Sequence, residues 1–159
     1  MSIEFKMRRI SPNVYDRMMS GEPPFPYRYV AESGQIAKRW EVTAFILANG
    51  DRTNPGPAMA IVGGRGISDG PDDYGGLRAF SAAEVVTIAQ ELAELSEDEF
   101  RRRFECLDFT GVSGSELDGR PANNIDSYLD CLYHLRNFYS AAAQAGRQAG
   151  RQAGRQATP

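Results

Sequence analysis

The side chains best suited to binding chemistry are arginines and aromatic residues at the ends of predicted helices and strands. Arginine pairs with anions and stacks on aromatic rings, and tryptophan offers a flat face to a planar or cationic ligand. The side chains that would line one pocket for a small anionic ligand are Arg39, Trp40, Arg65, Tyr74 and Arg78. The helical spacing of Trp40 with Ile36 and Leu47 favours instead a tryptophan of the hydrophobic core. The pocket is therefore the alternative interpretation of these residues.

Two loop motifs resemble ligand sites only in part. Residues 63–66 read Gly-Gly-Arg-Gly, but no lysine and no predicted helix follow, as they would in a phosphate-binding loop. Asp69, Asp72 and Asp73 come next, and their charges would repel a phosphate. The spacing of these aspartates does not match a calcium-binding loop. Both segments are predicted to be solvated turns.

The remaining residues that could do covalent or metal chemistry are few. His134 is the single histidine, and Cys106 and Cys131 are the two cysteines. One histidine and two distant cysteines do not make a zinc site, and the sequence has no nucleophile motif. We predict no catalytic residue, no metal site and no cofactor. Cys131 is predicted to lie in the core of a helix.

The charge of the chain divides into two unlike parts. The 159 residues include 18 basic and 21 acidic ones, for a net charge of -3. Three of the basic residues are Arg147, Arg151 and Arg155, so the preceding part has 15 basic and 21 acidic residues and a charge of -6. Such a body is poorly suited to nucleic acid and better suited to a basic partner. Any contact with RNA is confined to the last arginines.

The composition is that of one globular domain. The sequence is 42% hydrophobic, 25% charged and 10% aromatic, which excludes disorder of the whole chain. It has no apolar run of the roughly 18 residues that a membrane helix needs. Residues 1–10 alternate charged and apolar side chains, unlike a secretion signal. A cytoplasmic protein with reduced cysteines is expected.

The first half of the chain alternates strand and helix patterns. Period-two alternation predicts a strand over residues 3–8, and Ser11 followed by proline predicts the start of a short helix. Helical spacing predicts a core helix over residues 33–48, ended by Asn49-Gly50. The apolar run at residues 59–62 predicts a buried strand.

The second half is predicted to be helical. Ser81 and Ser96 each precede a glutamate by three residues, which is the pattern of a capping box, so two successive helices are expected. A strand is expected near residues 107–112, inside a glycine-rich and serine-rich loop. The last long helix begins near Asn124.

The chain divides into a domain, residues 1–145, and a tail, residues 146–159. The tail is made of Ala-Gly-Arg-Gln repeats, of which the sequence has three. Each repeat carries a glycine, which costs about 1 kcal/mol relative to alanine in a helix, and no large apolar side chain to offset it. The tail is therefore predicted to be disordered.

Several blocks together resemble the YfbM-like family, a bacterial family of unknown function. The matching blocks, which span about residues 3–145, are Lys38-Arg39-Trp40, Gly63-Gly64-Arg65-Gly66-Ile67, Tyr74-Gly75-Gly76-Leu77-Arg78-Ala79-Phe80 and Leu135-Arg136-Asn137-Phe138-Tyr139-Ser140-Ala141-Ala142. The resemblance implies a compact single α/β domain with a small mixed sheet packed between helices. Family members often carry a histidine where this chain has Ala44, so chemistry that depends on that imidazole is not expected.

These observations favour a small cytosolic module that binds another protein. We expect a regulatory role of the antitoxin or immunity type, without catalysis, because no catalytic constellation is present and the body is acidic. The alternative is a small-molecule-binding protein or enzyme that uses the arginine and aromatic pocket around Trp40, with a small anionic ligand. Neither hypothesis involves a membrane.

Overall fold

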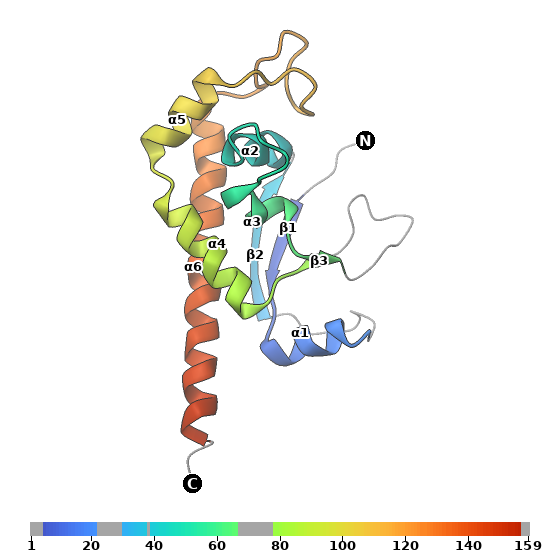
Figure 1. Ribbon diagram of the computed structural model, residues 1–159, viewed down its shortest axis with the longest axis vertical. Coiled ribbons are helices and arrows are strands. Elements are labelled where there is room, and N and C mark those ends of the chain that lie inside the picture. The colour runs from blue at the N-terminus through green and yellow to red at the C-terminus, as the bar shows by residue number, and fades with distance from the viewer. Residues whose placement is uncertain (1–4, 22–29, 38, 67–77, 157–159) are drawn as a thin grey trace.

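The computed structural model describes residues 5–21, 30–37, 39–66 and 78–156, and these segments are mostly helical (Figure 1). They form six α-helices, one short 3-10 helix and two separate pairs of antiparallel strands. The predicted α/β class is met only in the coarse sense that helices and strands share one domain. Within the described segments the strands make two antiparallel pairs, and the single mixed sheet predicted between helices is not formed.

The longer strand pair joins β1 (Phe5–Arg9) and β2 (Val30–Ala37). Phe5 lies opposite Ala37 and Arg9 lies opposite Val30, so the strands are antiparallel. The pair runs alongside the longest helix, α6 (Ile125–Gln156), and β2 contacts that helix (Figure 1). The strand predicted at residues 3–8 is confirmed for the part that the structure describes.

Between the two strands, α1 (Pro12–Met19) begins as predicted. The Ser11 hydroxyl accepts a hydrogen bond from the Val14 amide at 3.3 Å, and this bond satisfies one of the free amides of the first turn. Met18 is the buried residue of this helix.

The prediction of a helix over residues 33–48 is wrong for its first part. Residues 33–37 belong to β2, and the helix α2 (Trp40–Leu47) begins only at Trp40. Pairing with β1 provides hydrogen bonds to the backbone around Gly34, a residue that weakens helices. The end was predicted correctly, because Asn49 (φ 51°) and Gly50 (φ 74°) both adopt the left-handed conformation that stops α2.

The strand predicted at residues 59–62 is also wrong. The segment forms α3 (Met59–Val62), which follows the 3-10 helix η1 (Gly56–Ala58). Burial was anticipated, since Ala60 is 0% and Ile61 7% exposed. A four-residue apolar run fits a buried strand and a buried helical turn equally well, and here the preceding η1 already sets helical geometry. A short pair of strands, β3 (Arg65–Gly66) and β4 (Arg78–Ala79), follows.

Both predicted capping serines start helices. At α4 (Ala82–Glu94), the Ser81 hydroxyl accepts from the Glu84 amide at 3.2 Å and the Glu84 carboxylate accepts from the Ser81 amide at 2.6 Å. At α5 (Glu97–Cys106), Ser96 accepts from the Glu99 amide at 3.1 Å. The Glu99 carboxylate does not return to the cap, because it binds arginines of its own helix.

The helix α6 is the spine against which the other elements pack (Figure 1). Its buried side chains are Tyr128, Leu129, Cys131, Leu132, Leu135, Tyr139 and Ala143. The Tyr139 hydroxyl donates to the Ala60 carbonyl at 2.7 Å and fixes α3 to the spine. Burial raises the pKa of this phenol and keeps it a neutral donor.

The spine continues to Gln156, whereas disorder was predicted from residue 146. Alanine, glutamine and arginine favour helices, and extending an existing helix avoids the unfavourable nucleation step. These two effects offset the glycine in each repeat. The division into residues 1–145 and 146–159 stays a prediction.

Two arginines bind the carbonyl groups at the ends of other helices. Arg136 of α6 donates from Nε to the Leu92 carbonyl at 2.8 Å and from Nη2 to the Leu95 carbonyl, at the end of α4. Arg103 of α5 donates from Nη1 to the Leu47 carbonyl at 2.7 Å, at the end of α2. The last carbonyls of a helix have no hydrogen-bond partner within it and form the negative end of its dipole. A guanidinium there therefore both caps the carbonyls and neutralises the partial negative charge.

We predict that Arg136→Met destabilises the domain by about 2 kcal/mol, because two carbonyls of a partly buried helix end lose a charged donor. Urea unfolding followed by circular dichroism measures the change. Arg102→Met is the matched control, since the exposed Arg102 side chain binds Glu99 of its own helix and caps no carbonyl of another helix within the described segments, and the loss of this surface ion pair should destabilise the domain much less. Equal effects of both variants would contradict the capping role.

Candidate functional site

The predicted ligand residues lie on two separate parts of the fold. Arg39 and Trp40 stand at the start of α2 and are both half-buried. Arg39 donates from Nη1 to the Ser127 carbonyl of α6 at 3.2 Å, and Trp40 packs against the core cluster. The position of Trp40 agrees with the core interpretation of this residue.

The other predicted ligand residues belong to the short strand pair or lie outside the described segments. Arg65 and Arg78 are exposed on β3 and β4. Arg78 donates to the Gly64 carbonyl at 3.2 Å and thereby closes the strand pair. Tyr74 is outside the described residues. The structure thus brings Arg39 together with Trp40, and Arg65 together with Arg78.

The residues considered for covalent or metal chemistry are dispersed. His134 is exposed on α6 and Cys106 is exposed at the end of α5, whereas Cys131 is buried. Burial raises the pKa of the Cys131 thiol and keeps it protonated. In the described segments no three His, Cys, Asp or Glu side chains are grouped to hold a metal ion. The aspartates at residues 69–73 lie outside those segments.

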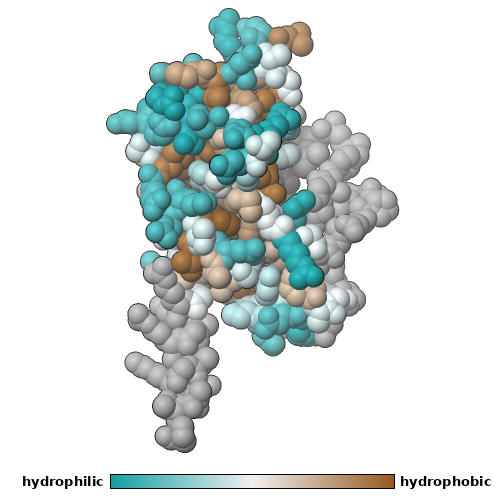
Figure 2. All heavy atoms as spheres, viewed as in Figure 1, coloured by the Kyte–Doolittle hydropathy of each residue, from teal (hydrophilic) through white to brown (hydrophobic). Residues whose placement is uncertain are grey.

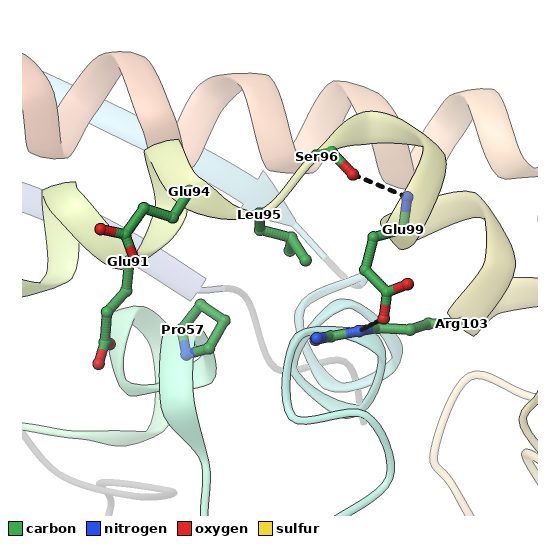
Figure 3. Close-up of a pocket in the computed structure, with 7 residues that line it drawn as sticks. All are labelled: Pro57, Glu91, Glu94, Leu95, Ser96, Glu99 and Arg103. Atoms are coloured by element: carbon green, nitrogen blue, oxygen red, sulfur yellow. Dashed lines mark hydrogen bonds and ion pairs between the residues drawn. The ribbon is translucent and has the colours of Figure 1, made fainter.

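A groove of about 420 Å³ lies under the bend between α4 and α5 (Figure 3). Its lining residues are Pro57, Glu91, Glu94, Leu95, Ser96, Glu99 and Arg103. Pro57 of η1 and Leu95 at the bend provide apolar surface, and the acidic side chains come from α4 and α5 on either side (Figure 3). The bend exists because Ser96 starts a new helix two residues after α4 ends.

The two sides of this groove differ in electrostatics. On α5, the Glu99 carboxylate accepts from Arg102 Nε at 2.7 Å and from Arg103 Nε at 2.9 Å. These hydrogen bonds, with that from Arg102 the larger, lower the Glu99 pKa to about 2. On α4, Glu91 and Glu94 form no ion pair within the described segments, although Glu94 accepts a hydrogen bond from Gln90 at 3.3 Å. Three carboxylates and one guanidinium give the lining a net charge of -2.

This arrangement suits binding of cationic groups better than catalysis. The Ser96 hydroxyl in the groove accepts a hydrogen bond from the Glu99 amide as a helix cap. A cation with an aliphatic stem would meet both the apolar surface and the carboxylates.

The loop between α5 and α6 is ordered by its own hydrogen bonds, and the strand predicted near residues 107–112 is not formed. The Phe109 amide donates to the Gly119 carbonyl at 3.1 Å, and the Gly119 amide donates to the Glu116 carbonyl at 3.0 Å. Phe109 and Val112 are buried and anchor the loop to the core. Glycines at three positive-φ positions, 111, 114 and 119, make its turns. Local turn chemistry therefore replaces strand pairing in this segment.

At the tip of this loop, Leu117 is 107% exposed, the highest exposure among the large hydrophobic residues that the structure describes as exposed. The neighbouring side chains of Glu116 and Asp118 are exposed as well. Asp118 pairs with Arg120 at 2.9 Å, which holds the acidic side of the tip in place. Hydrophobic colour is visible among hydrophilic surface at this end of the molecule (Figure 2).

The sequence analysis did not select Leu117. The available signal was a large aliphatic residue alone in a segment of glycine, serine and charged residues. Such a residue is ordinary on protein surfaces. It becomes notable only because the surrounding loop is closed by its own hydrogen bonds and holds Leu117 outward.

The fold and these surfaces define a small α-rich domain with an acidic groove and a projecting apolar loop. A family model described as a domain of unknown function (DUF1877) matches residues 1–149, and the chain belongs to this family. No curated protein and no solved structure matches the chain. In the described segments no helix combines the length and apolar character required to cross a membrane.

We predict that the Glu99 carboxyl titrates near pH 2, well below its ordinary value of 4.5. The folded state favours the ionised form, so this carboxyl stabilises the domain above about pH 4.5, and the contribution is lost as the pH falls toward 2. Carboxyl-carbon NMR titration of the folded domain measures the midpoint. A Glu99 midpoint at its ordinary value of 4.5 would contradict the prediction.

We predict that Gly119→Ala destabilises the loop by about 2 kcal/mol, because its φ is +77° and an added Cβ would lie 2.6 Å from Thr110 Oγ1. Amide hydrogen exchange across residues 107–122 measures the loss of protection. Gly111→Ala shares the positive φ but meets nothing within 4 Å, so it should cause a smaller loss. Unchanged exchange in Gly119→Ala would show that the loop is not rigid.

Proposed function

We propose that this domain is a protein-binding module without catalysis, with a regulatory role of the antitoxin or immunity type. The observation that supports it best is the ordered loop that holds Leu117 outward at 107% exposure. The proposal takes the chain to be a cytoplasmic bacterial protein of the YfbM-like kind, on the residue blocks that suggest that resemblance.

The rigidity of the loop is what distinguishes Leu117 from an ordinary exposed leucine. Burying one leucine side chain contributes about 1.5 to 3 kcal/mol. A flexible loop would lose much of this gain to ordering on association, but a loop already fixed by Phe109, Val112 and its turn hydrogen bonds does not. Leu117 is therefore pre-organised as an anchor.

The charges beside Leu117 indicate the chemistry of the partner. Glu116 and Asp118 flank the leucine, and Arg120 neutralises only one of them. An apolar pocket edged by lysine or arginine would complement this tip. The net charge of -6 on residues 1–146 would steer such a basic partner toward the domain over a longer range.

A second candidate is a small anionic ligand bound near Trp40. The half-buried Arg39 makes one hydrogen bond, to Ser127, within the described segments, so its guanidinium has further donors that an anionic ligand could use. Arg65, Tyr74 and Arg78 complete the predicted lining. A thermal-shift screen with anionic metabolites tests this candidate, and a shift that Arg39→Gln abolishes would favour it over protein binding.

We predict that Leu117→Asp abolishes capture of a stoichiometric partner, because it replaces the apolar anchor with a third acid at the tip. The measurement is cross-linking in cells from a photoreactive residue at position 113 in the same loop, followed by mass spectrometry. Val62→Asp is the matched control, since Val62 is an exposed aliphatic residue at 45% on another surface, and it should retain the cross-link. Retention by Leu117→Asp would contradict the proposal.

A further inference from the structure

The groove under the bend between α4 and α5 is acidic and has an apolar floor. No residue of the described segments neutralises its charge on the α4 side or covers that floor. Pro57 and Leu95 provide the apolar surface, and Glu91 and Glu94 form no ion pair with any residue that the structure describes. With Glu99 and Arg103 the lining carries a net charge of -2. The groove is therefore suited to a segment that carries several cations on aliphatic stems.

The same chain contains such a segment. The final turns of α6 extend past the rest of the molecule (Figure 1). The sequence places arginines at 147, 151 and 155 and no acid after Asp130. A four-residue spacing advances a helical residue by about 40°, so the three arginines fall along one side of the helix. This segment carries a charge of +3, opposite to that of the groove.

The position of this segment directs it away from the groove of its own chain. Gly146 lies beside Ala82, at the start of α4, where a Cβ on the glycine would be 3.9 Å from the Ala82 Cβ. The groove is at the other end of α4, beyond Glu91, and α4 has 13 residues or about 20 Å of length. From Gly146 the helix runs on in the opposite direction (Figure 1). A helical segment can therefore enter only the groove of another molecule.

We infer that the groove of one copy binds the arginine-bearing turns of α6 from a second copy. The arginine stems cover Pro57 and Leu95, and the guanidinium groups pair with Glu91 and Glu94, as arginine does with carboxylates elsewhere. Each copy offers one groove and one segment, so a reciprocal exchange closes a dimer. The loop tip at Leu117 is not an alternative occupant, because Glu116 and Asp118 would meet the acids of the groove.

Sedimentation velocity of the full chain over a range of protein concentrations tests the inference. Charge pairing at a solvent-exposed groove is screened by salt, so the chain should dimerise at about 0.01 M salt and the association constant should fall at least about tenfold at about 1 M. A monomer at low salt and high protein concentration overturns the inference. A salt-dependent change that is independent of protein concentration also overturns it, since this result means docking within one chain.

Two charge-neutralised variants separate this contact from other modes of dimerisation. Arg147→Gln/Arg151→Gln/Arg155→Gln removes the charge of the segment, and Glu91→Gln/Glu94→Gln removes that of the groove, with helix propensity retained in both. Each variant alone should be monomeric at low salt. Their mixture should form a weaker heterodimer, because one intact groove meets one intact segment. Dimers in either variant alone, or no association in the mixture, overturn the inference.

The same samples distinguish this contact from the proposed function. Leu117→Asp should dimerise as the wild type does, because Leu117 is not part of the groove. The two charge variants should retain the partner that cross-links near residue 117. A wild-type chain that stays monomeric at low salt but still captures the partner overturns only the dimer, and a wild-type chain that dimerises but captures no partner overturns only the loop as a docking site.

Discussion

Burial of one side of α6 is the constraint on which the rest of the structure depends. Tyr128, Leu132, Leu135 and Tyr139 are nearly inaccessible to solvent, and α4, β2, α2 and α5 all pack on this helix. The strand pairs are too short to form a core by themselves, because two-stranded pairs are at most marginally stable alone. The domain is therefore organised by a helix and carries its strands as lateral additions.

Several arginines outside the repeats stabilise the packing of the helices on α6. Arg136 and Arg103 close the ends of α4 and α2, and Arg39 ties α2 to the Ser127 carbonyl. A guanidinium suits this task because its several donors reach neighbouring carbonyls at once and its charge opposes the helix dipole. The sequence has 16 arginines and two lysines, and these contacts explain part of that excess of arginine.

The sequence predicted what is encoded locally. Both serine caps, the stop at Asn49 and the apolar side of α6 follow from short-range rules, and the structure confirms them. Residues 33–37 were assigned wrongly because a distant partner, β1, pairs with them. Residues 59–62 were assigned wrongly because a short apolar run does not distinguish a strand from a helical turn, and the preceding η1 sets helical geometry. The groove could not be predicted, since it joins Pro57 to residues more than 30 positions away. The importance of Leu117 could not be predicted either, because the periodicity of the sequence does not show that the loop around it is ordered.

The two cysteines differ in solvent exposure, so a reagent can distinguish between them. Cys131 is buried on the core side of α6 with its thiol held protonated, whereas Cys106 is exposed at the last turn of α5. A thiol-reactive reagent applied to the folded chain will therefore modify one position without any engineering. A fluorophore or spin label placed there sits on the helix that forms one wall of the acidic groove, so the native chain supplies its own reporter for that surface.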